Sequence, residues 1–439
     1  MQIKNENKQK INLVVIGNVD SGKSTTCGHL LFSLGEINQR EIQNFQKEAD
    51  EKKKSSFGFA FVMNKTQSEK DRGITIDISM KQFFTKNFTY NLIDAPGHQN
   101  FVKNMITGTQ QADLALLMVS AHKGEFESGF SKDGQTKEHA LLAYTLGVKK
   151  IIICVNKMDQ ESVKYTESRY NEVSQEVENY LKKIIGYKNV TSIPISGFKG
   201  DNLLKKSEKM PWYSGPSLYE LLDSQTAPQR PTDKPLRLPI QQVFKIQGIG
   251  VVVSGKVETG IIKPNMQVIV QPGNKTYKVL SIEAHNTHLE QAGPGEVIGI
   301  NLKGVTIQDV QKGMVISDIS NLPCKTVKEF IAQIMVLNHP KGIKQGYSPV
   351  ISIHTEQITC KLDKILGIID KKTGKIIENC EFNEEELQKQ LFKKGQSIMV
   401  KMKSAKDLVV EKFQDFPSLG RFVIRDQKKT VGIGIIKEL

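Results

Sequence analysis

The sequence predicts a parallel α/β domain followed by two antiparallel β domains. Up to about Leu222, amphipathic stretches alternate with apolar runs such as INLVVIG, YNLID, LALLMVSA, IIICVNKMD and VTSIPIS. Continuous apolar runs separated by helices are typical of a parallel sheet that is covered on both faces. Further along, short β-branched strands follow one another without helices, which indicates an antiparallel barrel or sandwich. The length of 439 residues fits three domains of about 150 residues each.

Two breaks divide the chain. The first, near Thr226, is the segment TAPQRPTDKPLRLP, whose four prolines neither a helix nor a central strand tolerates. The second is the Asn-Leu-Pro segment that ends at Pro323. We therefore predict an α/β domain over residues 1–230 and β domains over 231–325 and 326–439. Within the last, NEEELQKQL, with Leu387 and Leu391, predicts a short surface helix or a loop insertion.

Composition excludes several classes of protein. Lysine and arginine exceed aspartate and glutamate by 61 − 47 = 14, which suggests a polyanionic partner such as nucleic acid or the ribosome, or simply a basic soluble protein. Five cysteines without a CxxC pair argue against a disulfide framework or a thiolate zinc site. The first ten residues lack an apolar signal region, and the longest apolar run, Leu114 to Val119, is far shorter than a span of ~20 residues. We expect a cytoplasmic protein with no membrane partner.

The segment GNVDSGKS, from Gly17 to Ser24, matches the phosphate-binding loop GxxxxGK[ST]. It follows the strand INLVVIG and precedes the helix STTCGHLLFSLG, which is the context that such a loop requires. Glycines let backbone amides surround the phosphates, the lysine reaches the β and γ oxygens, and the final serine hydroxyl binds Mg²⁺. The predicted nucleotide ligands here are Asn18, Val19, Asp20, Ser21, Gly22, Lys23, Ser24 and Thr25.

A second motif selects the base. Asn156-Lys157-Met158-Asp159 ends the apolar strand IIICV. The Asp159 carboxylate can accept hydrogen bonds from both N1–H and the exocyclic amine of guanine, a pair that adenine lacks, so GTP is favoured over ATP. We expect Asn156 to brace the loops, Lys157 to lie over the base, and the Ser196-Gly197 turn to offer an amide to the guanine oxygen.

Two further segments occupy positions suited to sensing the γ-phosphate. In Asp94-Ala95-Pro96-Gly97-His98, Asp94 can hold a Mg²⁺-bound water, the Gly97 amide can meet the γ-phosphate and His98 can orient the attacking water. In RGITID, Thr75 can supply a second hydroxyl to Mg²⁺. Loss of the γ-phosphate would release both segments, so hydrolysis would also act as a conformational switch.

These motifs together resemble eukaryotic elongation factor 1-alpha. The resemblance is carried by GNVDSGKSTTCGHL, RGITIDIS, DAPGHQNFVKNMITGTQQAD, GQTKEHALLAYTLGV, NKMD, PTDKPLRLPIQQVFKIQGIG, KVETGIIKP and LGRFVIRDQKKTVGIGIIK. It implies a P-loop GTPase domain followed by two antiparallel β-barrel domains. It also implies GTP-dependent delivery of aminoacyl-tRNA to the ribosomal A site by a monomer, with GTP/GDP and Mg²⁺ as cofactors and a nucleotide exchange factor and actin as further partners. By position it assigns catalysis to His98, beside an apolar gate of Val19 and Ile74.

Some positions depart from the family pattern. Asn18 and Ser21 replace the two histidines of GHVDHGK, and Gln99-Asn100 replaces a basic-acidic pair. Val297 stands where the resemblance implies an asparagine that receives the aminoacyl amino group, whereas Glu283, near the expected pocket for the terminal adenosine, is retained. Arg421 and Arg425 are expected to contact the tRNA backbone. Because valine cannot form that hydrogen bond, two alternatives stay open: a release or ribosome-rescue GTPase, and a GTP-binding cytoskeletal protein.

Overall fold

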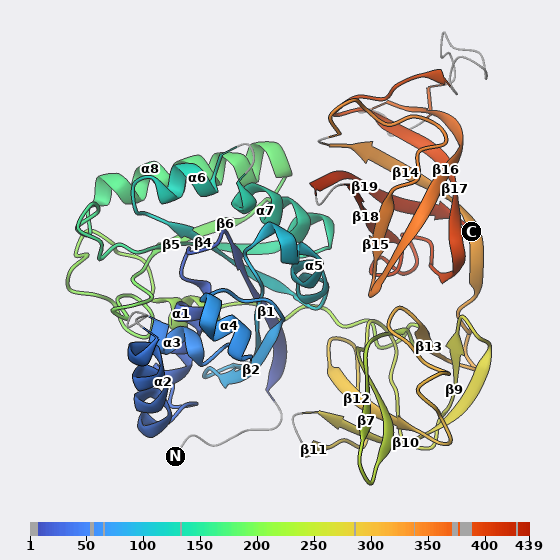
Figure 1. Ribbon diagram of the computed structural model, residues 1–439, viewed down its shortest axis with the longest axis horizontal. Coiled ribbons are helices and arrows are strands. Elements are labelled where there is room, and N and C mark those ends of the chain that lie inside the picture. Colours follow the sequence, from blue (N-terminus) through green and yellow to red (C-terminus); the bar gives the residue numbers. More distant parts are fainter. Residues whose placement is uncertain are drawn as a thin grey trace. The chain divides into compact units, whose positions relative to one another are not determined.

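A computed structural model describes the chain in two compact units, one ending at Pro228 and one beginning at Gln229, and each is considered by itself (Figure 1). The described residues are 8–52, 57–64, 66–131, 134–284, 287–337, 339–370, 376–377, 389–426 and 429–439.

The first unit is built on a six-stranded sheet with the order β2-β3-β1-β4-β5-β6. Its strands are β1 (Gln9–Gly17), β2 (Ser79–Phe84), β3 (Phe88–Asp94), β4 (Leu114–Ser120), β5 (Lys150–Asn156) and β6 (Val190–Pro194). All neighbours run parallel except β2 and β3. The predicted parallel sheet is confirmed except at this edge, where the additional strand β2 pairs antiparallel with β3. A connection as short as residues 85–87 cannot cross the sheet, so it forms an antiparallel hairpin.

Helices cover both faces of this sheet. They are α1 (Lys23–Ser33), α2 (Gln39–Glu51), α3 (Gly58–Phe61), α4 (Gln67–Arg72), the 3₁₀ helix η2 (Gln99–Phe101), α5 (Val102–Gln110), α6 (Glu125–Gly129), α7 (Gln135–Thr145), α8 (Glu167–Asn179), the π-helical turn η3 (Tyr180–Ile185) and α9 (Leu218–Asp223). Leu13 and Val15 of β1 pack in one core with Leu30 of α1. The alternate residues Val14 and Ile16 are also buried, and α5 and α7 contact β1. Burial on both faces explains why the strand is a continuous apolar run.

The second unit contains two closed antiparallel sheets, so the choice between barrel and sandwich is decided in favour of barrels. The strands of the first are β7 (Leu238–Ile246), β8 (Gly250–Lys256), β9 (Gln267–Gln271), β10 (Lys275–Ala284), β11 (Thr287–His288), β12 (Val297–Leu302) and β13 (Val315–Asp318). Their order is β11-β10-β12-β8-β7-β13-β9, and pairing of β9 with β10 closes the ring. The short strand β11 lies beside β10, outside that ring.

The second barrel has the order β14-β17-β16-β15-β18-β19. Its strands are β14 (Thr326–Val336), β15 (Val350–Ile353), β16 (Glu356–Ile369), β17 (Ser397–Val409), β18 (Arg421–Asp426) and β19 (Lys429–Glu438). Alternate residues such as Ile398, Val400 and Met402 fill its interior, as the two-residue period of a strand requires. The predicted helix or insertion at NEEELQKQL lies mostly outside the described residues.

Within the described ranges, no helix is long and apolar enough to cross a membrane. Cys27, Cys154, Cys324 and Cys360 are buried free thiols.

Candidate nucleotide-binding site

A cavity of about 590 Å³ lies at the carboxyl ends of β1, β3 and β5, the edge at which open parallel sheets bind ligands. It collects segments far apart in the sequence. Among the predicted residues, its lining includes Val19, Asp20, Gly22, Lys23, Ser24, Thr25, Ile74, Thr75, Gly97, His98, Asn156, Lys157 and Asp159. The remaining predicted residues of the first unit, Asn18, Ser21, Asp94, Ser196 and Gly197, contact these lining residues from behind.

The loop after β1 prepares an anion site at the start of α1. Gly22 precedes the helix with φ 84 and provides no side-chain cap, so the first amides of α1 are left for a ligand. A Cβ on Gly22 would lie 2.3 Å from Asn156 Nδ2, so only glycine fits between these loops.

Lys23 is held within this loop. Its Nζ donates to the carbonyl oxygens of Asn18 at 2.6 Å and Gly17 at 3.1 Å. Burial lowers the pKa of Lys23 to about 8, although the Asp94 charge opposes the shift. A Cβ on Gly97 would lie 2.4 Å from this Nζ, so the segment after β3 approaches the lysine closely. Arriving phosphate oxygens would therefore meet a cation that is already positioned.

Three predicted magnesium ligands converge from distant parts of the chain. The Ser24 hydroxyl donates to Asp94 Oδ2 at 2.5 Å and lies 2.9 Å from the Thr75 hydroxyl. Asp94 is fully buried, and burial raises its pKa to about 6. Within the described part of the chain, Asp94 Oδ1 has no hydrogen-bond partner. A buried carboxylate with a spare oxygen, beside two hydroxyls, is a donor set that suits a hard divalent cation such as Mg²⁺.

The NKMD loop is tied to its neighbours in the way expected for a base-binding loop. Asn156 donates through Nδ2 to the carbonyl of Ser21 at 2.8 Å and accepts from the Gly197 amide at 2.8 Å. The Gly197 amide therefore braces Asn156 in this structure, and an amide from this turn to the guanine oxygen stays a prediction. The Asp159 carboxylate lines the cavity and accepts from the Ser196 hydroxyl at 2.6 Å.

Glu125 is a residue of this site that the sequence reasoning missed. Its carboxylate contacts Lys157 Nζ at 2.7 and 3.0 Å, accepts from Ser120 and lines the cavity. Burial would raise the pKa of Glu125, but the hydrogen bonds from Lys157 and Ser120 outweigh it and lower the pKa. The ion pair holds Lys157 at the cavity wall. Glu125 comes shortly after the end of β4, and that position was the available signal.

Glu69 is a second missed residue. Its Oε1 accepts from the amides of Ile76 at 2.9 Å and Asp77 at 3.0 Å, and its Oε2 accepts from the amide and hydroxyl of Thr66. These bonds outweigh burial and lower the pKa of Glu69. Glu69 thus fixes the segment that carries Thr75. The sequence signal was the T-x-x-E capping box at the start of α4.

His98 lines the cavity together with Val19 and Ile74, the residues predicted to gate it. Its Nδ1 accepts from the Asn100 amide at 3.2 Å and so caps η2. This bond leaves Nε2 as the nitrogen available to a water.

The residues expected to contact tRNA all lie in the second unit and differ in their exposure and contacts. Glu283 on β10 pairs with His288 at 3.3 Å, and Val297 is half-buried on the neighbouring strand β12. Arg425 is 8% exposed, and Arg421 Nε donates to the Pro417 carbonyl at 2.7 Å. Burial also lowers the pKa of Arg421. Arg425 is therefore buried and Arg421 half-buried, and contact of these arginines with a tRNA backbone stays a prediction.

Comparison with known proteins agrees with this geometry. The family model described as "Elongation factor Tu GTP binding domain" matches residues 8–228, "Elongation factor Tu domain 2" matches 250–317 and "GTP-eEF1A C-terminal domain-like" matches 329–437. Elongation factor 1-alpha of Tetrahymena pyriformis is 50% identical over 434 residues, covering 98% of each chain. The chain belongs to the elongation factor 1-alpha family. The Entamoeba histolytica member is also 50% identical, over 98% of this chain and 96% of its own length.

As an elongation factor 1-alpha family member, the chain is a GTP-binding translational GTPase. Among solved structures, the Saccharomyces cerevisiae Ski7 GTPase-like domain bound to GTP matches with a TM-score of 0.77 and 19% identity, covering 98% of this chain and 97% of that one. At that identity the likeness concerns the fold alone.

Proposed function

We propose that this GTPase delivers aminoacyl-tRNA to the ribosomal A site in the cytoplasm and is reloaded by a nucleotide exchange factor. The observation that carries the proposal is the convergence of Lys23, the Ser24–Thr75–Asp94 cluster and Asp159 around one cavity. The cavity thus has groups suited to a triphosphate, a divalent cation and guanine. Membership of the elongation factor 1-alpha family supports translation elongation as the process in which this nucleotide switch acts.

Each part of the cavity has a proposed task. The amides at the start of α1 and Lys23 neutralise the β and γ oxygens. Ser24, Thr75 and Asp94 would hold Mg²⁺, and the ion would supply positive charge that offsets the charge developing on the phosphates. Asp159 accepts from guanine while Lys157, restrained by Glu125, covers the base.

Hydrolysis is assigned to His98. A histidine at the end of the segment after β3 can orient a water toward the γ-phosphate through Nε2 without acting as a full base. Val19 and Ile74 would keep the His98 side chain away from this water until the ribosome docks. This arrangement couples hydrolysis to correct delivery.

Protection of the aminoacyl ester tests delivery directly. GTP-loaded protein at micromolar concentration is mixed with aminoacyl-tRNA, and spontaneous ester hydrolysis is followed against the GDP-loaded form. We expect slower hydrolysis with GTP only. Equal rates with both nucleotides would reject delivery.

Val297 is the reason to keep a second candidate, a release or rescue GTPase that carries a tRNA-shaped protein. Valine offers no hydrogen bond to an aminoacyl amino group. In the same assay, Val297→Asn should strengthen protection if this side chain lies in the aminoacyl pocket. Absence of protection together with co-purification of a release-factor-like partner would favour the second candidate. GTP-independent sedimentation with filaments, without ribosome binding, would favour a cytoskeletal role.

A further inference from the structure

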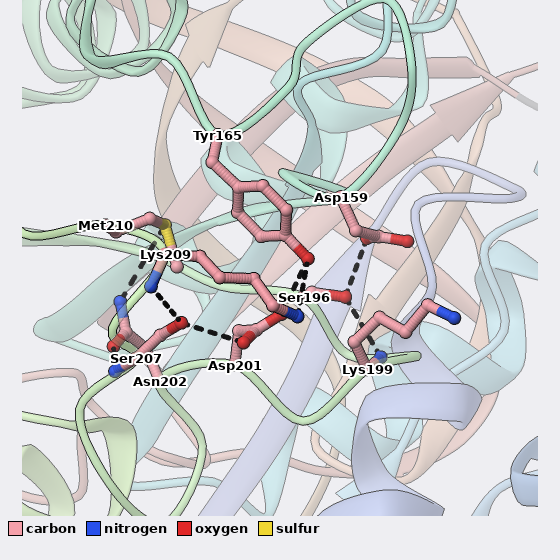
Figure 2. A network of polar contacts seen from close by, with 9 residues as sticks. All are labelled: Asp159, Tyr165, Ser196, Lys199, Asp201, Asn202, Ser207, Lys209 and Met210. Carbon is pink, nitrogen blue, oxygen red and sulfur yellow. Dashed lines mark hydrogen bonds and ion pairs between the residues drawn. The ribbon is translucent and has the colours of Figure 1, made fainter.

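Figure 2 shows two of the contacts that join the loops flanking the guanine-recognising carboxylate. Next to the cavity, the Ser196 hydroxyl donates to Asp159 Oδ1 at 2.6 Å. Further out, the Tyr165 hydroxyl donates to Asp201 Oδ2 at 2.8 Å. The second contact lines no part of the cavity, and nothing in the nucleotide motifs requires it.

Tyr165 closes the loop that begins at the NKMD motif. Its amide donates to the Met158 carbonyl at 2.8 Å, and its own carbonyl accepts from Trp212 Nε1 at 2.9 Å. Lys164 and Tyr165 have φ of 48° and 57°, a left-handed conformation that is unfavourable for such residues. Surrounding contacts must therefore hold this loop end in place.

Asp201 closes the opposite loop in the same way. Its carbonyl accepts from the Ser196 amide at 3.1 Å, so the turn that begins at Ser196 ends at Asp201. Its carboxylate, 11% exposed, accepts from the Ser207 hydroxyl at 2.8 Å and contacts Lys209 Nζ at 3.4 Å, in addition to Tyr165. Three donors hold this carboxylate in one orientation.

The chemistry of the pair is that of a donor and a fixed acceptor. Burial, together with the bond to Asp201, raises the pKa of Tyr165, so its hydroxyl stays protonated and donates. Lys209 also lies over the Tyr165 ring at 5.2 Å. This ring contact does not depend on the hydroxyl, but the hydroxyl also accepts from Lys209 Nζ at 3.3 Å, so its removal eliminates that longer bond together with the bond to Asp201.

We propose that the Tyr165–Asp201 hydrogen bond is a positioning contact for guanine recognition, which holds the NKMD loop against the Ser196 turn so that Asp159 keeps its orientation. The inference rests on the proposed role of Asp159 in binding guanine. Without the bond, the outer ends of the loops can separate, while the Ser196–Asp159, Gly197–Asn156 and Met158–Ile195 bonds still join the two sides near the cavity. Contacts to the phosphates come from other segments and should persist.

The test compares Tyr165→Phe with Tyr187→Phe in the full chain. Tyr187 is a matched control because its hydroxyl is buried in the same unit and has no hydrogen-bond partner among the residues that the structure describes. Dissociation rates of fluorescent GDP and of fluorescent IDP, which lacks the exocyclic amine, are measured together with the thermal midpoint of each variant.

For Tyr165→Phe we expect GDP to dissociate about three- to tenfold faster, because the loop end loses the hydrogen bond to Asp201 and the longer one from Lys209. IDP should change less, because it makes fewer contacts with Asp159, so the GDP-to-IDP preference falls. Tyr187→Phe should leave both rates and their ratio unchanged. Asp201→Asn, which keeps an acceptor for Tyr165, should fall between the wild type and Tyr165→Phe.

Unchanged GDP dissociation and an unchanged GDP-to-IDP ratio in Tyr165→Phe would overturn the inference, whatever happens to the thermal midpoint. A wild-type protein that does not prefer GDP to ADP would instead reject the guanine role of Asp159. The two failures are therefore distinguishable.

Discussion

Arg237 Nε donates to Glu411 Oε1 at 2.6 Å and thereby joins the two barrels of the second unit. The arginine side chain is 1% exposed, and its guanidinium lies 4.5 Å from the Phe416 ring. A buried cation of this kind is tolerated only while its partner is present.

We therefore expect Glu411→Gln to destabilise the second unit by about 3–5 kcal/mol, the cost of a buried charge without its partner. Urea unfolding of the full chain, followed by a probe in the second unit, measures this. Lys328→Ala, which removes an exposed ion pair with Asp407, serves as the control and should have no resolvable effect. Equal effects of the two substitutions would contradict the prediction.

Asp159→Asn should change the base preference. An amide can donate to the 2-oxo group of xanthine, where a carboxylate accepts from the guanine amine. We expect weaker GTP binding by about 1–3 kcal/mol, roughly fivefold to 150-fold, with a gain for XTP. Competition of both nucleotides against fluorescent GDP is the measurement, and retained guanine selectivity would reject the assignment.

His98→Ala should lower ribosome-stimulated GTP hydrolysis by roughly a hundredfold or more, because the attacking water loses its orienting group. GTP affinity should stay at the wild-type value, since His98 is not assigned a ground-state contact. Single-turnover hydrolysis on ribosomes and equilibrium binding separate the two effects. Unchanged turnover would remove the catalytic role of His98.

Glu69→Gln should weaken the effect of Mg²⁺ on nucleotide release. Glutamine offers an amide donor where Thr66, Ile76 and Asp77 present donors of their own, so Thr75 loses its support. We expect Mg²⁺ to slow release of a non-hydrolysable GTP analogue by roughly three- to tenfold less than in the wild type. Asp71→Asn, an exposed change on the same helix, is the control. For each variant, the release rate in EDTA is divided by the release rate in Mg²⁺. The same ratio in Glu69→Gln and Asp71→Asn would show that Glu69 has no such role.

His354 makes the second unit sensitive to acid. Burial lowers the pKa of His354 to about 4, from about 6.5 in the unfolded chain. Because the unfolded form binds the proton first, the stability contributed by neutral His354 is complete above pH 6.5 and is lost as pH falls toward 4, by up to about 3 kcal/mol.

Unfolding free energies between pH 7 and pH 4.5 test this. His354→Asn tolerates the φ of 34° at this position and should flatten the pH dependence. His288→Asn, at an exposed histidine, should leave it unchanged. The same slope in wild type and His354→Asn would assign the acid sensitivity to other groups.

Much of the nucleotide site could be predicted from local sequence. A phosphate loop needs glycines, a lysine and a following helix within a few residues, and a base-binding loop needs its carboxylate at a strand end, so Lys23, Asp94 and Asp159 are recognisable without coordinates. The order of apolar runs likewise predicts the parallel part of the sheet, because its strands are buried on both faces.

Only the tertiary structure shows which side chains are buried in the barrels and which distant segments contact one another. Period-two alternation shows that a strand has two faces, but not which face turns into a closed barrel, so the burial of Arg425 on β18 could not be predicted from the sequence. Likewise Ser24 meets Thr75 and Asp94, and Tyr165 meets Asp201, only after folding. The chain by itself determined which groups can bind GTP, because those groups act over a few residues. The fold decided which side chains hold them in position, because such contacts join segments that no local pattern connects.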